Sequence, residues 1–280
     1  MITGFDHFIV LVNDLDVAVQ TFRNLGFDAR GGGQHPAFGS HNALIALADG
    51  TYLELVAFRD PALAATTFWG AGVAKLRAGE GWGGFVLASN DLANDAAHLR
   101  ERALAVGEPS AGSRTRPDGQ TVAWHIALIN ATTVGVLPFL IQDDTPRTLR
   151  VEPANAGLGS RARVREVIVA VKDATTARDA YRALLGGEPT RVKNTAGDVE
   201  GYRVACEWGS IVLAQPARGG SALAEQLAKR GEGLYALTLQ IEGMGRDRRE
   251  LRQRGIALTN DAQGFLIAPE FACGARIRVV

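Results

Sequence analysis

The chain has 280 residues, enough for one large domain or two of ordinary size, and 46% of them are hydrophobic while 21% are charged. Thirty basic residues balance thirty acidic ones, so no overall charge would draw the protein onto nucleic acid or an anionic membrane surface. Two cysteines are too few for a disulfide framework, and we find neither a secretory signal peptide nor an apolar run of about 20 residues, so we expect a cytoplasmic protein.

The first 60 residues predict a strand, a helix and a hairpin. Residues 5–12 are mostly β-branched or aromatic, as expected for a buried strand. The pair Asn13-Asp14 that follows is a favourable helix N-cap, and residues 17–27 then carry apolar side chains at helical spacing. Residues 41–58 predict two strands around Asp49-Gly50, which is a strong two-residue turn signal.

The same order of strand, helix and further strands recurs three more times. New copies begin with strands at residues 83, 164 and 234, so the period is roughly 70–80 residues. The polar, Pro- and Gly-containing segment between the second and third copies predicts a linker. We therefore expect an α+β fold with two domains, residues 1–145 and 162–280, joined by a linker over residues 146–161.

Four β-α-β-β-β units joined in pairs resemble the vicinal oxygen chelate superfamily, which includes glyoxalase I, extradiol dioxygenases and bleomycin resistance proteins. The first half resembles its glyoxalase-like domain group, through the segments FDHFIVLVNDLDVAVQTFRNLGF, GSHNALIALADGTYLEL, SRTRPDG, VAWHI and LPFLIQ. The likeness covers residues 1–150 well and residues 162–280 mainly through the order of the modules. It implies four βαβββ modules paired into two tandem glyoxalase/bleomycin-resistance/dioxygenase-type domains, with a small-molecule cleft and commonly a divalent metal at its base.

The resemblance also indicates ligand positions, because this superfamily draws metal ligands from the first and last strand of each module. Alignment on the helix starts assigns His7 and Glu54 in the first module, and both are of the right chemical type. In the later modules the aligned residues are Gly84 and Pro138, Glu166 and Leu213, and Ala236 and Arg278. Catalytic metal sites usually have three protein ligands plus water. The cofactor therefore stays open: one weakly bound divalent metal ion on His7 and Glu54, or none.

His7 and Glu54 stand in apolar strand runs, where a polar side chain is costly to bury unless it is paired. We expect them to meet, either as a satisfied polar pair at the end of the sheet or as groups that line the cleft and act on a ligand. His41 is a third candidate. If Asp49-Gly50 is a two-residue turn, His41 pairs with Phe58 and shares the face of Glu54, about 13 Å along the strand. It would then line the same cleft without reaching the same ion.

Four further residues are candidates for ligand binding. Arg114 and Arg116 precede a Pro-Asp-Gly turn and could grip a carboxylate or phosphate, although an exposed turn with ordinary surface charges gives the same pattern. Trp124 could be a flat platform in the cleft or a core residue of its strand. Asn42 lies at a strand end near the expected mouth of the cleft.

Two kinds of function follow from these expectations. The first is an enzyme in which a small oxygenated or carbonyl substrate lies on Glu54 as general base, with His7 orienting it or both residues holding a weak divalent ion. Lyase, isomerase and dioxygenase chemistry all fit this description. The alternative is a metal-free, drug-sequestering binding protein with an aromatic cleft. We expect a monomer or homodimer with a small-molecule ligand, no nucleic-acid or membrane partner, and a second half that is a structural partner.

Overall fold

Each of the four predicted modules forms as one strand, one helix and three strands in the computed structural model, which describes residues 1–130, 135–193 and 199–280. The predicted α+β fold of paired βαβββ modules is therefore confirmed. The first module contains β1 (Ile2–Leu11), α1 (Leu15–Asn24), β2 (Arg30–His35), β3 (Ser40–Ala46) and β4 (Tyr52–Phe58). The second contains β5 (Gly81–Ser89), α4 (Leu92–Glu101), β6 (Ser110–Thr115), β7 (Thr121–Ala127) and β8 (Phe139–Asp143).

The second half repeats this order. The third module contains β9 (Ala162–Ala170), α6 (Ala174–Leu185), β10 (Thr190–Lys193), β11 (Val199–Cys206) and β12 (Gly209–Pro216). The fourth contains β13 (Gly233–Ile241), α8 (Met244–Gln253), β14 (Leu258–Asn260), β15 (Phe265–Ile267) and β16 (Arg276–Val279). Short helices join the modules: α2 (Pro61–Ala65), α3 (Gly70–Arg77), α5 (Arg147–Arg150) and α7 (Ala222–Arg230). Asp14, Asp91 and Asp173 cap α1, α4 and α6 by accepting hydrogen bonds from backbone N–H groups of the first turn.

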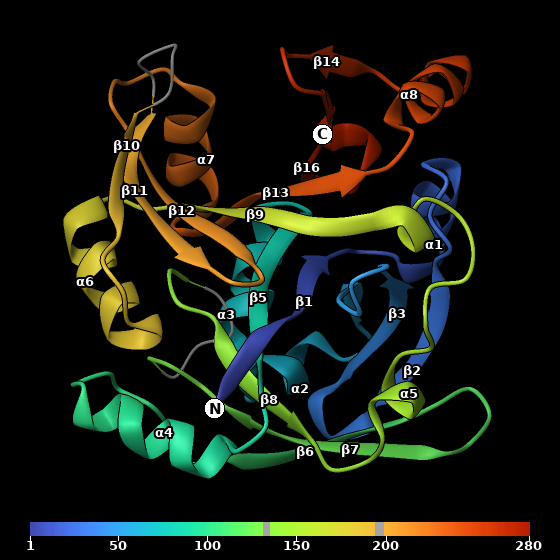
Figure 1. Cartoon of the computed structure of the whole chain (residues 1–280). Coiled ribbons are helices and arrows are strands. Elements are labelled where there is room, and N and C mark those ends of the chain that lie inside the picture. The colour runs from blue at the N-terminus through green and yellow to red at the C-terminus, as the bar shows by residue number, and fades with distance from the viewer. Residues whose placement is uncertain (131–134, 194–198) are drawn as a thin grey trace.

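The eight strands of the first two modules form a closed barrel in the order β1-β4-β3-β2-β6-β7-β8-β5 (Figure 1). β1 and β5 pair antiparallel where the modules meet, and one pair between Gln34 of β2 and Thr115 of β6 closes the other side. Along β1, Ile9 and Leu11 pack inside the barrel while Phe8 packs outside it, as the alternation of a strand requires. The barrel therefore has an apolar outer face that needs a cover.

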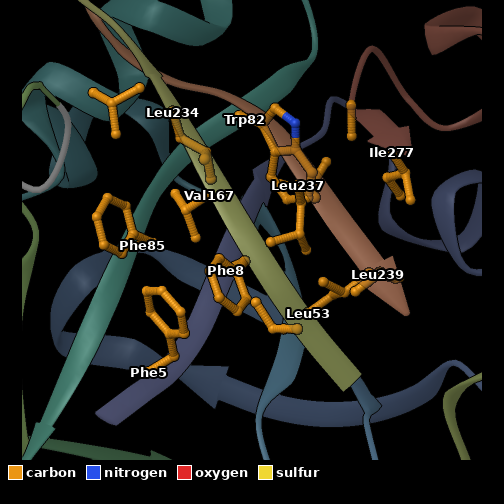
Figure 2. Packing of buried hydrophobic residues seen from close by; sticks show 14 of the residues in the cluster. Phe5, Phe8, Leu53, Trp82, Phe85, Val167, Leu234, Leu237, Leu239 and Ile277 are labelled. Atoms are coloured by element: carbon orange, nitrogen blue, oxygen red, sulfur yellow. The ribbon is translucent and has the colours of Figure 1, made fainter. Parts of the chain in front are cut away.

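The second half provides that cover. Strands β9 to β16 form one open sheet in the order β10-β11-β12-β9-β13-β16-β15-β14, and this sheet crosses the outside of the barrel (Figure 1). Phe8 and Phe85 of the barrel pack in one continuous hydrophobic cluster with Val167 of β9 and Leu237 of β13 (Figure 2). Because the cluster spans both sheets, the second half stabilises the barrel by burying its outer face.

Different segments cover the two ends of the barrel interior. Between β4 and β5, the α2–α3 segment adds Trp69 to the hydrophobic cluster that contains Ile9, near the end of β1. Near the start of β1, α5 places Arg150 in contact with Asp6. The segment predicted to be a plain polar linker therefore closes one end of the barrel. The division into two domains with a linker over residues 146–161 stays a prediction.

Two further findings bear on the expectations from composition. Cys206 and Cys273 are both free thiols. Within residues 1–130, 135–193 and 199–280, no helix is long and apolar enough to cross a membrane.

Candidate functional site

A β-bulge in the first strand brings together side chains of the candidate site. β1 pairs with β5 on both sides of Asp6, but Asp6 itself is an extra residue without a partner in β5. The bulge lets Phe5 and Phe8 both face outward, with their ring centres 5.4 Å apart. It also leaves Asp6 and His7 side by side with their side chains in contact, whereas a regular strand would put neighbours on opposite faces.

The structure brings His7 and Glu54 together, as the sequence predicted. Nε2 of His7 lies 3.2 Å from Oε2 of Glu54, and Nδ1 of His7 lies 2.6 Å from Oδ1 of Asp6. His7 and Glu54 are only 4% and 7% exposed. They meet because β1 and β4 are parallel neighbours in which Ile9 lies beside Glu54. One imidazole is thus held between two carboxylates.

The charges of these three groups stabilise one another. Burial alone would lower the pKa of His7, but hydrogen bonds to Asp6 and Glu54 outweigh burial and raise it. Burial alone would raise the pKa of Glu54, but the hydrogen bond and charge of His7 lower it to about 2. Burial likewise opposes ionisation of Asp6, while the charge of Arg150 holds its pKa well below the usual range. All three shifts therefore favour an imidazolium between two ionised carboxylates.

Hydrogen bonds from other elements hold both carboxylates in place. Nδ2 of Asn42 donates to Oε1 of Glu54 at 2.6 Å. The guanidinium of Arg150 donates to the two oxygens of Asp6 at 2.9 and 2.8 Å and also to the hydroxyl of Tyr52. Asp6 and Arg150 were not among the residues predicted from the sequence. The one signal in the sequence for Asp6 was an Asp beside a His in an apolar run. No local pattern marks Arg150 as its partner, because Arg150 stands 144 positions from Asp6.

These groups line a small hollow inside the barrel, the inner cavity, with a volume of about 40 Å³. A cavity needs roughly 10–15 Å³ to hold one water molecule, so the inner cavity has room for few atoms. A larger ligand has to displace part of the aromatic lining. The polar lining residues are His7, His35, Asn42, Tyr52, Glu54, Arg114 and Arg150, and the aromatic ones are Phe38, Phe68, Trp69, Trp124 and Phe139.

His35 is a second buried imidazole at the inner cavity. Its Nδ1 lies 3.2 Å from Oγ of Ser40, and its ring stands edge-on to Trp124 with the centres 5.9 Å apart. Burial lowers the pKa of His35 to about 4, so the ring is neutral near pH 7. The two histidines of the cavity therefore differ: the surroundings of His7 favour its charged form, whereas His35 is a neutral group that can donate or accept a hydrogen bond.

The prediction that His41 shares the face of Glu54 is wrong. The connection between β3 and β4 spans residues 47–51, so Glu54 pairs with Leu44, one residue away from the expected register. A slip of one residue moves every side chain of the strand to the other face. His41 therefore lies on the outer face of the barrel, and its neighbour Asn42 faces the inner cavity.

The other predicted ligand-binding residues are divided between the interior and the rim. Trp124 and Arg114 line the inner cavity, whereas Arg116 does not. Arg114 is 2% exposed and donates to Oδ1 of Asn42 at 3.4 Å and to a backbone carbonyl. Arg116 lies beside the turn and donates to Glu152 at 3.2 Å. Of the two predicted arginines, Arg114 is therefore the one placed to meet a ligand inside the barrel.

The second module lacks a counterpart to the His–Glu pair. In each of the first two modules, one residue of the last strand pairs with the residue five positions before the helix cap. That residue is Glu54 in the first module and Phe139 in the second, so Phe139, rather than the predicted Pro138, is the counterpart of Glu54. The counterpart of His7 is Gly84. Neither residue can bind a metal.

The donor set does not complete a metal site. Asp6 behind His7 is the kind of partner that metal-bound imidazoles have, and Glu54 supplies a second donor. A third is missing, because no group of three or more His, Cys, Asp or Glu side chains suited to a metal occurs in the part of the chain that the structure describes. We therefore derive no chemical step through a metal ion.

Solved structures with the same fold span the whole chain. A hypothetical protein from Staphylococcus aureus is similar with a TM-score of 0.70 and 15% identity, over 99% of this chain and 98% of that one. A mutant of 4-hydroxymandelate synthase from Streptomyces coelicolor gives 0.67 and 14%, over 99% and 92%. A xylose isomerase-like TIM barrel/4-hydroxyphenylpyruvate dioxygenase fusion protein gives 0.61 and 13%, over 100% and 49%. At these identities the likeness shows the fold alone.

Paired βαβββ modules are the fold that the resemblance to the vicinal oxygen chelate superfamily implied. The chain belongs to the glyoxalase-like domain family, whose profile matches residues 5–185. That range contains the barrel from Phe5 of β1 onward and the first strand and helix of the third module. No curated protein sequence matches the chain.

Proposed function

We propose that the inner cavity binds a small oxygenated or carbonyl compound and that the protein moves a proton next to the carbonyl group of this compound. The observation that carries the proposal is the 3.2 Å contact between Nε2 of His7 and Oε2 of Glu54 at the inner cavity. An acid and a base at this spacing can serve two neighbouring atoms of one substrate: His7 the carbonyl oxygen, and Glu54 the adjacent carbon.

The proposed step begins when the substrate's carbonyl oxygen replaces Glu54 as acceptor of the His7 Nε2–H. Glu54 then becomes a stronger base, because burial raises its pKa and the lost hydrogen bond from His7 no longer lowers it. Its carboxylate takes a proton from the adjacent carbon. The C–H electron pair forms the C=C bond of an enol, and the carbonyl oxygen takes the proton of His7. Return of the two protons to different atoms or faces completes an isomerisation.

Asp6 and Arg150 are positioning residues in this proposal. Asp6 accepts the Nδ1–H of His7, which fixes the ring and directs the second N–H at the cavity. Arg150 binds both oxygens of Asp6 and keeps that carboxylate ionised. An ionised Asp6 in turn stabilises the imidazolium that donates the proton.

The donor set favours two of the three expected reaction classes. Isomerase and lyase reactions need only the proton transfer between substrate, His7 and Glu54. Dioxygenase chemistry needs a redox metal, and such metals take more protein donors than these two residues provide. Proton transfer is thus the chemistry that the described side chains support.

A metal-free binding protein is the second candidate, and the aromatic lining favours it. The rings of Phe38 and Phe68 meet edge-on with centres 4.8 Å apart, and Trp69 lies 5.2 Å from Phe68. Walls of this kind bind flat, conjugated ligands through buried area alone. In this alternative, His7 and Glu54 orient the ligand and no bond changes.

Proton exchange in D₂O tests the proposal. Hydroxyacetone, pyruvate and related small hydroxyketones and 2-oxo acids are incubated with the protein, and loss of the α-proton signal is followed by NMR. We expect accelerated exchange for at least one compound and a loss of about 10²–10⁴-fold in Glu54→Gln. His41→Gln is the matched control, because its side chain lies outside the barrel. Binding without exchange supports the second candidate, and equal exchange by wild type and Glu54→Gln ends the proton-transfer proposal.

A further inference from the structure

A second and larger hollow lies at the barrel end that α5 covers. This linker cavity has a volume of about 220 Å³, which suits a small metabolite, since drug-sized ligands usually occupy roughly 300–1,000 Å³. Arg114 and Arg150 line both cavities and so belong to the wall between them. The other charged residues of the linker cavity are Asp28, Arg30, Arg116, Asp118 and Glu152, and its apolar residues include Leu44, Ala46 and Val151.

Three of the four arginines of the linker cavity have carboxylate partners. Their charges are thus compensated within the protein. The pairs are Arg30 with Asp28 at 2.6 Å, Arg116 with Asp118 at 3.1 Å, and Arg150 with Asp6 at 2.8 Å.

Arg114 is the exception. Its hydrogen bonds go to two neutral oxygens, Oδ1 of Asn42 and the backbone carbonyl of Arg150. Its Nε has no hydrogen-bond partner, and none of the ion pairs formed by described residues includes it. Burial lowers the pKa of Arg114, yet a guanidinium cannot give up its proton in a protein. The charge of Glu54 favours this guanidinium, but no carboxylate of the described residues is within hydrogen-bond distance of it, so Arg114 has capacity for one carboxylate partner.

Glu152 shows that the walls of the linker cavity can bind a carboxylate. Its Oε2 lies 2.8 Å from Nη1 of Arg30, and its Oε1 lies 3.2 Å from Nη2 of Arg116. One carboxylate thus bridges a guanidinium of β2 and a guanidinium from the residue that follows β6. The side chain of Glu152 is 53% exposed and does not line the inner cavity, so a change at this residue affects the linker cavity alone.

We propose that the linker cavity binds a small organic monocarboxylate, with the carboxylate on Arg114 and an apolar body against Leu44, Ala46 and Val151. Arg114 is a single guanidinium without a carboxylate in contact, and Asp28, Asp118 and Glu152 already add negative charge to this cavity, so a monoanion fits it better than a dianion. This ligand site is additional to the proton transfer proposed at Glu54.

Titration calorimetry with butyrate and benzoate tests this inference, with butyramide and benzamide as neutral ligands of matched shape. We expect both acids to bind about tenfold or more tightly than their amides, because a charge-assisted hydrogen bond is lost in the amide. Glu152→Gln should bind the acids several-fold more tightly, since it removes a negative charge from the wall. Glu188→Gln, an exposed glutamate of the second half, is the matched control and should bind as wild type does.

Arg114→Gln should lose the preference for acids over amides. If this buried substitution prevents folding, the Glu152→Gln comparison decides. Amides that bind as tightly as acids would overturn the proposal, and so would equal affinities in wild type, Glu152→Gln and Glu188→Gln. Because the titration needs no turnover, its result does not depend on the chemistry proposed at Glu54, and failure of one proposal leaves the other standing.

Discussion

The two halves of the molecule have the same strand order but differ in closure. In the first half, β2 and β6 have six residues each, and their pairing closes the barrel around an interior. In the second half the corresponding strands, β10 and β14, have four and three residues, and the described residues of that half form an open sheet. One module order therefore gives either a lined cavity or a cover, depending on the strands at the sheet edges.

The halves differ again at equivalent positions. Glu166 stands seven residues before the helix cap in β9, as His7 does in β1. Glu166 forms a partly exposed ion pair with Arg203 and accepts a hydrogen bond from Ser210. The first half thus retains an enclosed acid–base pair, whereas the second half retains one carboxylate whose charge an arginine neutralises.

The largest expected difference between the halves is in the unfolding free energy lost when each polar network is broken separately, at Asp6 in the first half and at Glu166 in the second. Asp6→Asn leaves the buried guanidinium of Arg150 without its main partner, and loss of one member of a buried pair costs about 3–5 kcal/mol of unfolding free energy. Glu166→Gln breaks a partly exposed pair and should cost about 0–1 kcal/mol. Urea denaturation measures both. Equal losses of unfolding free energy would show that the two networks contribute similarly to stability, which would contradict this prediction.

The dependence of the unfolding free energy on pH, measured at acid pH, tests the charge of Glu54 in the first half. The pKa of Glu54 falls from 4.5 to about 2 on folding, as His7 outweighs the effect of burial. A carboxylate with a depressed pKa stabilises the fold above its unfolded pKa and loses that contribution as the pH falls through its folded pKa. We expect on the order of 3 kcal/mol to be lost between about pH 4.5 and pH 2 through Glu54. The unfolding free energy of Glu54→Gln should fall less steeply than that of the wild type over this pH window. A slope equal to that of the wild type would contradict the lowered pKa of Glu54.

The buried histidines give a spectroscopic test that reports on the barrel alone, because all five histidines of the chain precede residue 130. NMR titration of the ring protons should place the pKa of His7 above 6.5 and that of His35 at about 4. The raised pKa of His7 means that its contribution to stability is complete below 6.5 and is lost as the pH rises through the folded value. Glu54→Gln should lower the pKa of His7 and leave the ring charge of His35 near neutral pH unchanged. Two rings that titrate together would rule out the charge pattern of the site.

The sequence was sufficient for the fold because the evidence for it is local. A cap such as Asp14 or Asp173 and the apolar spacing after it lie within about ten residues, and three of the four modules have such an aspartate cap. His7 and Glu54 were also within reach, since each is a polar residue in an apolar strand. These signals do not depend on how distant segments pack.

The missed features depend on distant partners. The bulge at Asp6 is set by pairing with β5, about 80 positions later in the chain, and no local preference marks it. The error at His41 came from the turn: Asp49 does not form a two-residue hairpin turn, because one carboxylate oxygen accepts from Thr51 and the other from the backbone N–H of Val164 in the second half. A contact between the halves thus fixes the register that places Asn42, rather than His41, at the site.

The smallest expected difference concerns the hydrogen bonds that support the two carboxylates. Asn42→Ala removes the buried donor to Glu54 and leaves Arg114 without one of its acceptors, so the unfolding free energy should fall by about 1–3 kcal/mol. Ser210→Ala removes a 3.2 Å hydrogen bond to Glu166 at a half-buried position, where Arg203 still binds the carboxylate, and should cost about 0.5–1.5 kcal/mol. Urea denaturation of both variants ranks them. A larger loss in Ser210→Ala would mean that the open sheet, rather than the barrel, depends more on its polar cluster.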